Sequence, residues 1–149
     1  MHQTAEMINA NPSRAVIQVD VLVECIEACL TCTQINLACA DACLGEPEPQ
    51  ELSRCIRLNL DCADICTATG RIVSRQHKPE MYLLRKQLES CVFACQICAS
   101  ECELHQKEHE HCRICAEQCR RTERVCQQML DQLVQGEGAV QRRAAQRPS

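Results

Sequence analysis

Sixteen of the 149 residues are cysteine, and their spacing is regular. They fall in four segments, and within each segment every step from one cysteine to the next is 3, 4 or 7 residues. An α-helix returns to the same face at these intervals, because about 3.6 residues make one turn. Each segment therefore presents a stripe of sulfur where a soluble helical protein normally presents leucine and isoleucine. The sixteen residues are Cys25, Cys29, Cys32, Cys39, Cys43, Cys55, Cys62, Cys66, Cys91, Cys95, Cys98, Cys102, Cys112, Cys115, Cys119 and Cys126.

Stripes of thiols favour the binding of a soft metal ion. Thiolates select Cu(I), Zn(II) or iron–sulfur clusters, and the compact cysteine runs of ferredoxins, which end in Cys-Pro, are absent. Cysteines one turn apart, such as Cys62 and Cys66, are separated by about 5.4 Å along the axis. Such a pair suits the near-linear coordination that Cu(I) accepts and Zn(II) does not. One Cu(I) per thiolate also cancels buried charge, so we expect multiple Cu(I) ions, near one per cysteine.

Three histidines follow the third cysteine segment as H-x3-H-x-H-C, namely His105, His109 and His111. Imidazole binds copper and exchanges it. We therefore expect these side chains to bind ions at one mouth of the thiol core and pass them inward. The alternative is ordinary turn polarity, and His2 and His77 are expected to be exposed or structural residues.

Other roles for the cysteines compete with copper binding. Packing alone would leave voids where larger aliphatic side chains are missing. A disulfide framework is disfavoured because no secretory signal is visible and the default compartment is a reducing cytosol. A metallothionein-like zinc or cadmium buffer remains open, as does a thiol–disulfide redox protein, which needs an accessible, acidified thiolate. The C-x-x-C pairs available to such a protein are Cys29/Cys32, Cys95/Cys98 and Cys112/Cys115.

The remaining composition excludes several other functions. The net charge of −4 gives no case for a nucleic acid or a membrane surface. No apolar run approaches the roughly 20 residues that span a bilayer. We find no nucleophile beside a base, no phosphate-binding loop and no open metal triad, so no enzymatic activity is expected.

Turn-forming residues divide the chain into four long predicted helices. The first begins after Asn11-Pro12 and ends at Gly45, and the second begins near Pro49. The third begins at Pro79, and the fourth follows the histidines and ends at Gly136. Long helices with short connections favour an all-α, antiparallel up-down-up-down four-helix bundle.

The ends of the chain complete this prediction. Residues 2–10 are expected to form a short helix over one end of the bundle. Residues 1–136 form one copper-binding domain, and residues 137–149, which lack periodicity, form a disordered tail. Four polar residues on the sulfur stripes are expected to line the core without binding metal, namely Asn36, Asn59, Thr69 and Thr122.

The segment from Glu101 to Arg121 carries the motif EC-x2-H-x3-H-x-HC-RIC-AEQC-RR. With cysteine stripes on all four helices, it resembles the bacterial four-helix-bundle copper storage proteins, over about residues 13–133. The resemblance implies a homotetramer of bundles, each storing many Cu(I) ions. It also implies a cytosolic member, because the exported branch of that family carries a twin-arginine signal that is not seen here.

Overall fold

The computed structural model describes residues 2–147, which contain helices and no strands. The predicted all-α class is confirmed. The elements in chain order are α1 (His2–Ala10), α2 (Val19–Leu44), the short 3-10 helix η1 (Pro49–Leu52), α3 (Ser53–Val73), α4 (Met81–His105) and α5 (Glu110–Ala145).

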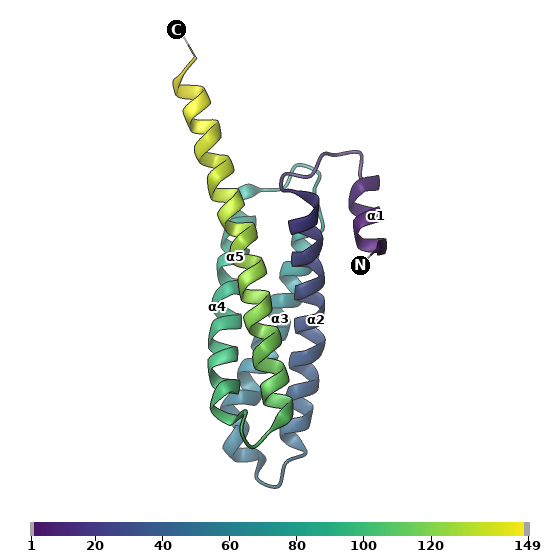
Figure 1. The fold of residues 1–149 in the computed structure, drawn as a ribbon, viewed down its shortest axis with the longest axis vertical. Helices are drawn as coiled ribbons and strands as arrows, with labels where there is room; N and C mark the ends of the chain where they lie inside the picture. Colours follow the sequence, from purple (N-terminus) through teal and green to yellow (C-terminus); the bar gives the residue numbers. More distant parts are fainter. Residues whose placement is uncertain (1, 148–149) are drawn as a thin grey trace.

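The four long helices lie side by side and alternate in direction (Figure 1). The chain runs down α2, up α3, down α4 and up α5, and α1 lies beside the upper part of α2. Helix α2 packs against α3 and α5, and α4 packs against the same two helices. Every long helix is therefore antiparallel to both of its neighbours, and the α2–α3 and α4–α5 connections lie together at the lower end.

Local signals account for most of the helix boundaries. Gly45 ends α2, and its N–H donates to the carbonyl oxygens of Asp41 and Ala42. Pro49 opens the helical turn before α3, as its fixed φ favours. At the start of α4, the Glu80 carboxylate accepts a hydrogen bond of 2.7 Å from the Leu83 N–H.

The first long helix begins later than predicted. Asn11-Pro12 does not start it, because the Asn11 side chain accepts a hydrogen bond of 2.9 Å from the Ser13 N–H and closes a local turn. Residues 11–18 form a non-helical link across the upper end, and α2 starts at Val19.

The prediction that residues 137–149 form a disordered tail is wrong for residues 137–145. Helix α5 continues through Gly136 to Ala145 and projects beyond the other helices (Figure 1). Gly136 and Gly138 lie inside this helix and cost about 1 kcal/mol each, but the alanine, glutamine and arginine residues that follow them are good helix formers. The part of the predicted tail at 148–149 lies outside the described residues.

Helix α2 also differs from the expectation that no segment is apolar enough to span a bilayer. By length and composition alone, it passes that test. Half of the apolar window is buried inside the protein, where cysteines face the other helices. Cysteine behaves as a small hydrophobe, so a core helix rich in this residue can pass the same test of length and mean hydropathy as a membrane span.

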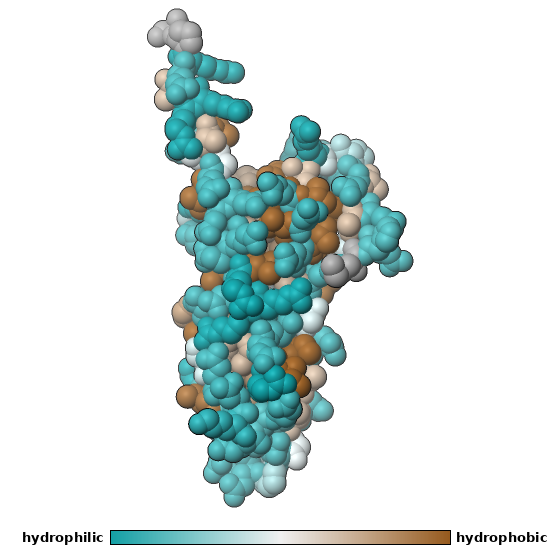
Figure 2. All heavy atoms as spheres, in the orientation of Figure 1, coloured by the Kyte–Doolittle hydropathy of each residue, from teal (hydrophilic) through white to brown (hydrophobic). Residues whose placement is uncertain are grey.

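The core changes character along its length. The upper end holds large hydrocarbon side chains, all at most 2 % exposed, namely Leu22, Val73, Leu84, Leu88 and Met129. Thiols take their place through the middle and toward the lower end. The outer surface is mainly hydrophilic, with hydrophobic side chains gathered near the upper end in the face seen in Figure 2. The interior below the hydrocarbon layer is thus available for metal chemistry.

Candidate metal centre

All sixteen cysteines point into the space between the four long helices. None is more than 2 % exposed, and all are free thiols. The disulfide alternative therefore finds no support among these residues. The C-x-x-C pairs at Cys29/Cys32, Cys95/Cys98 and Cys112/Cys115 are buried as well, whereas a redox catalyst needs an accessible thiolate.

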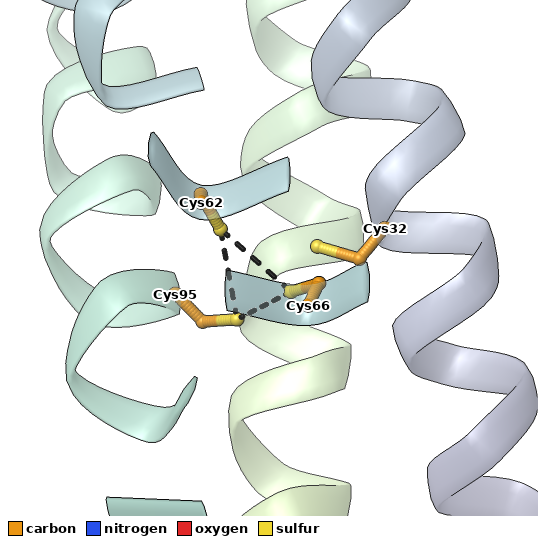
Figure 3. Close-up of side chains that lie close together, drawn as sticks. All are labelled: Cys32, Cys62, Cys66 and Cys95. Carbon is orange, nitrogen blue, oxygen red and sulfur yellow. Dashed lines mark hydrogen bonds between the residues drawn. The ribbon is translucent and has the colours of Figure 1, made fainter. Parts of the chain in front are cut away.

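Four thiols from three helices converge in the middle of the core (Figure 3). Cys32 extends from α2, Cys62 and Cys66 from α3, and Cys95 from α4. The Cys62 sulfur lies 3.9 Å from those of Cys66 and Cys95, and the last two are 3.8 Å apart. All four sulfurs lie within 4.8 Å of one another. This arrangement places four sulfurs within reach of a shared soft ion.

Similar groups repeat along the core, each drawing ligands from at least two helices. The expected pairs one turn apart take part in them, but facing helices supply additional sulfurs. Such groups, whose ligand atoms again lie within 4.8 Å of one another, are Cys25/Cys29/Cys126, Cys39/Cys102/Cys115 and Cys62/Cys98/Cys119. Cys62 belongs both to the central group of four thiols and to the last of these three groups, so neighbouring groups share ligands.

The lower mouth adds a nitrogen ligand to the thiols. His111 Nδ1 lies 3.5 Å from the sulfurs of Cys39 and Cys112 and 3.9 Å from that of Cys43. These four residues form a group of three sulfurs and one nitrogen within 4.8 Å. The imidazole of His111 therefore closes the thiol core at the end where α5 begins.

The opposite edge of the His111 ring faces outward to a carboxylate. Its Nε2 lies 2.9 Å from Glu46 Oε1, and His109 Nδ1 lies 3.1 Å from the same oxygen. The two imidazole rings are 5.4 Å apart. Burial lowers the pKa of His111, but hydrogen bonds with Cys39 and Glu46 outweigh it, so the net pKa is raised. The bond from His111 in turn lowers the pKa of Glu46.

The predicted histidine cluster is only partly brought together. His105 Nε2 pairs with Glu101 at 3.3 Å instead of facing the sulfurs. It lines a surface hollow of about 250 Å³ with His109 and Glu46. Of the other two histidines, His2 pairs with Glu6 at 3.0 Å, and His77 Nδ1 lies 2.6 Å from the Ser13 hydroxyl at the far end.

Hydrogen bonds between neighbouring thiols lower the pKa of some cysteines and raise the pKa of others. A bond with Cys126, whose sulfur lies 3.7 Å away, lowers the pKa of Cys25 to about 5. The same bond raises the pKa of Cys126. At the mouth, burial raises the pKa of Cys43 to about 11. Since the thiolate is the metal ligand, an ion that binds a protonated thiol takes the place of its proton.

Glu46 was not identified from the sequence as a residue of the site. Its position was nevertheless predictable in part, because it follows the Gly45 that ends the first long helix. In an antiparallel arrangement, that helix end lies at the same end as the histidines. What the sequence could not indicate was that one carboxylate oxygen would contact both His109 and His111.

Comparison with known proteins relates this geometry to one family. A family model described as copper storage protein matches residues 18–131. The structure of the copper storage protein Ccsp from Streptomyces lividans, loaded with 10 copper equivalents, is 41% identical with a TM-score of 0.84. That alignment covers 86% of this chain and 98% of the other.

Two further structures of Ccsp are similar to this chain. A five-copper structure of that protein, described as a cytosolic copper storage protein, is 46% identical with a TM-score of 0.74, and the alignment covers 75% of this chain and 93% of the other. A variant of Ccsp with one histidine replaced by alanine is 44% identical with a TM-score of 0.77, covering 78% and 98%. Comparison with curated proteins gives no match. From the matched family and these structures, the chain belongs to the copper storage protein family.

Proposed function

We propose that this protein stores Cu(I) in the cytosol and protects the cell from free copper. The observation that carries the proposal is the set of sixteen buried, reduced thiols arranged in groups within metal-binding reach. Soft sulfur ligands in a dry core suit a soft monovalent ion. No catalytic turnover is part of this function, because the ions are the cargo.

The ligands we assign are all sixteen cysteines, with His105, His109 and His111 at the mouth. We infer that residues 1–136 form one copper-binding domain with the architecture of an antiparallel up-down-up-down four-helix bundle. The alternating direction of α2 to α5 supports this architecture. The end of α5 projects from the domain.

We further propose that the protein is a homotetramer in the cytosol, as the family resemblance implies. The similarity to a cytosolic copper storage protein supports the location. An outward stripe on α2 supports association, because Leu30, Leu37 and Leu44 are each about half exposed or more, at steps of 7 residues. Neither a nucleic acid nor a membrane is a proposed partner.

A Cu(I) titration tests the storage function. Anaerobic addition of Cu(I) to the reduced protein is expected to saturate near one ion per cysteine, about 16 in all. Each ion that replaces a thiol proton releases it, so acid should be liberated in step with binding. Saturation at one or two equivalents would contradict storage.

The runner-up function is a zinc or cadmium buffer. Four sulfurs such as those of Cys32, Cys62, Cys66 and Cys95 also match the number of ligands in a structural zinc site. Metal analysis of protein from copper-fed cells, together with competition against a Cu(I) chelator, separates the two functions. Zinc that persists in the core after Cu(I) addition would favour the buffer.

The histidines at the mouth give a kinetic prediction. Replacing His109 and His111 together with alanine is expected to slow both uptake and release of Cu(I) by about tenfold or more, the scale on which supporting groups affect metal sites. The total capacity should fall by no more than about one ion, because all thiols remain. Stopped-flow measurement of Cu(I) transfer checks the rates, and His77→Ala at the opposite end is the matched control. Unchanged rates of uptake and release in the double variant would contradict the proposed role of these histidines.

A further inference from the structure

One carboxylate at the mouth of the thiol core is not among the proposed copper ligands. Glu46 follows Gly45, the residue that ends α2. Its backbone N–H donates to the carbonyl oxygen of Cys43 at 3.3 Å, so the turn after the helix fixes the point from which the side chain extends. From there, Oε1 lies 2.9 Å from His111 Nε2 and 3.1 Å from His109 Nδ1. Glu46 therefore joins the end of α2 to the start of α5.

The contact with Glu46 determines which nitrogen of His111 carries the proton. An ionised carboxylate can only accept hydrogen bonds, so Nε2 must be the donor. In the neutral imidazole, which is the form that binds a metal ion, Nδ1 is then the nitrogen with a free lone pair. Nδ1 is also the atom that faces the sulfurs of Cys39 and Cys112, each 3.5 Å away. His111 thus presents a metal-binding nitrogen to the thiols.

The same contact fixes the orientation of the His111 ring. Rotating an imidazole by half a turn about its bond to Cβ exchanges Nδ1 with the carbon Cδ2, and the two orientations have nearly the same shape. Packing alone therefore distinguishes them poorly. A hydrogen bond from Nε2 does distinguish them, because the rotated ring places the carbon Cε1 at that position. While Nε2 is held at Glu46, a carbon cannot replace Nδ1 beside Cys39 and Cys112.

A carboxylate in this position also supports metal binding chemically. A histidine ligand that donates its other N–H to a carboxylate has a more basic binding nitrogen and a fixed ring. The side chains of Glu46 and His111 are both partly buried, so water competes only in part for their hydrogen bond. His111 Nδ1 shares its site with the sulfurs of Cys39, Cys43 and Cys112. Glu46 therefore lies outside this set of ligands and acts on one of them.

We propose that Glu46 is a positioning residue for copper at the mouth: it holds the His111 ring with Nδ1 directed at the thiols, and it binds no copper itself. The inference rests on the proposed storage function and adds to it the group that orients a ligand. The contact with His109 restrains the carboxylate in the same place.

The charge of Glu46 offers a rival explanation, because any carboxylate near the mouth attracts a cation. Three other carboxylates line the same hollow, namely those of Glu48, Glu51 and Glu108. Among residues 2–147, none of these three forms an ion pair or hydrogen bond with an imidazole. An effect of charge should therefore be shared by all of them, whereas an effect on ring orientation should belong to Glu46.

Nuclear magnetic resonance of the reduced apo protein tests the positioning without copper. The Nε2–H proton of His111 is expected to exchange slowly enough with water to give a signal in the wild-type protein, because Glu46 accepts its hydrogen bond. Glu46→Ala should lose this signal. Glu46→Gln should keep it, because the amide oxygen can still accept. A wild-type His111 that carries its proton on Nδ1 would overturn the proposal.

Stopped-flow transfer of Cu(I) from a chelator tests the consequence for copper. Glu46→Ala is expected to take up Cu(I) about tenfold more slowly, the scale for groups that support a metal ligand, with its total capacity unchanged. Glu46→Gln should restore most of the wild-type rate. Glu48→Ala, which removes a carboxylate from the same hollow, is the matched control and should match the wild type. A wild-type rate in Glu46→Ala, or equal slowing in the alanine and glutamine variants, would contradict positioning.

A double variant shows whether Glu46 acts through His111. In a His111→Ala background, Glu46→Ala should cause no further slowing, because the ring that it orients is gone. A further loss of about tenfold would mean that Glu46 acts on copper directly and would refute the proposal. A capacity of one or two ions in the wild-type protein would instead contradict storage, and the resonance of the apo protein would still decide how the ring is held.

Discussion

Replacing Cys66 with alanine is expected to weaken Cu(I) binding by about 100-fold at the central thiol group, which consists of Cys32, Cys62, Cys66 and Cys95. Even supporting residues around a metal site can contribute that much. The Cys66 sulfur lies within 3.9 Å of the sulfurs of Cys62, Cys91 and Cys95. It therefore belongs to the largest thiol group and connects that group to the next thiol along the core. Its loss removes one of the four sulfurs of the central group. Chelator competition followed through the whole copper titration measures the effect.

The effect on folding should be small by comparison. Removing one buried sulfur leaves a cavity that costs about 1 kcal/mol, and the hydrocarbon end of the core is untouched. Val73→Ala, which makes a similar cavity in that hydrocarbon end, is the matched control and should retain the wild-type affinity. If Cys66→Ala and Val73→Ala bound copper equally well, the central thiol group would not be a copper-binding site.

Copper loading is expected to raise the melting temperature by at least about 15 °C. Below its hydrocarbon end the apo core is lined mainly by small thiols, whereas bound ions would link all four helices. A single site filled at 1,000 times its Kd adds about 4 kcal/mol to the free energy of unfolding. In a chain of this size, 1 kcal/mol moves the melting temperature by about 2–4 °C. Two such sites suffice for the expected shift, and the protein offers more.

Circular dichroism under anaerobic conditions measures this shift. The helical signal at room temperature should change little on loading, because the thiols already lie within reach of one another. Removal of copper with a strong chelator should restore the apo melting temperature, which separates metal binding from oxidation. Apo and loaded proteins that melt within a few degrees of each other would indicate that copper binds at the surface.

Several features were predictable because they depend on the chain's own periodicity. Steps of 3, 4 and 7 residues place Cys25, Cys29 and Cys32 on one face of a helix wherever that helix lies. Short connections at Gly45 and after His105 require neighbouring helices to be antiparallel. The location of the histidines at one end of the core follows from these two facts.

Helix ends were less predictable, because competing local interactions of similar energy decide them. Asn11 has the side chain of a helix cap, but it closes a turn with Ser13 instead. Gly136 has the character of a helix stop, yet α5 continues to Ala145 because good helix formers follow. Differences of about 1 kcal/mol decide such cases.

By itself, the sequence determined that sulfur lines the inside of four antiparallel helices, because helical periodicity and short connections leave little freedom. Only the tertiary structure decided which sulfurs meet, since the rotation and axial offset of each helix set the distances between Cys32, Cys66 and Cys95. The same packing placed Glu46 against two histidines and brought Asn36 against Cys98 and Cys119. These contacts join residues far apart in the chain, and no spacing along one helix encodes them.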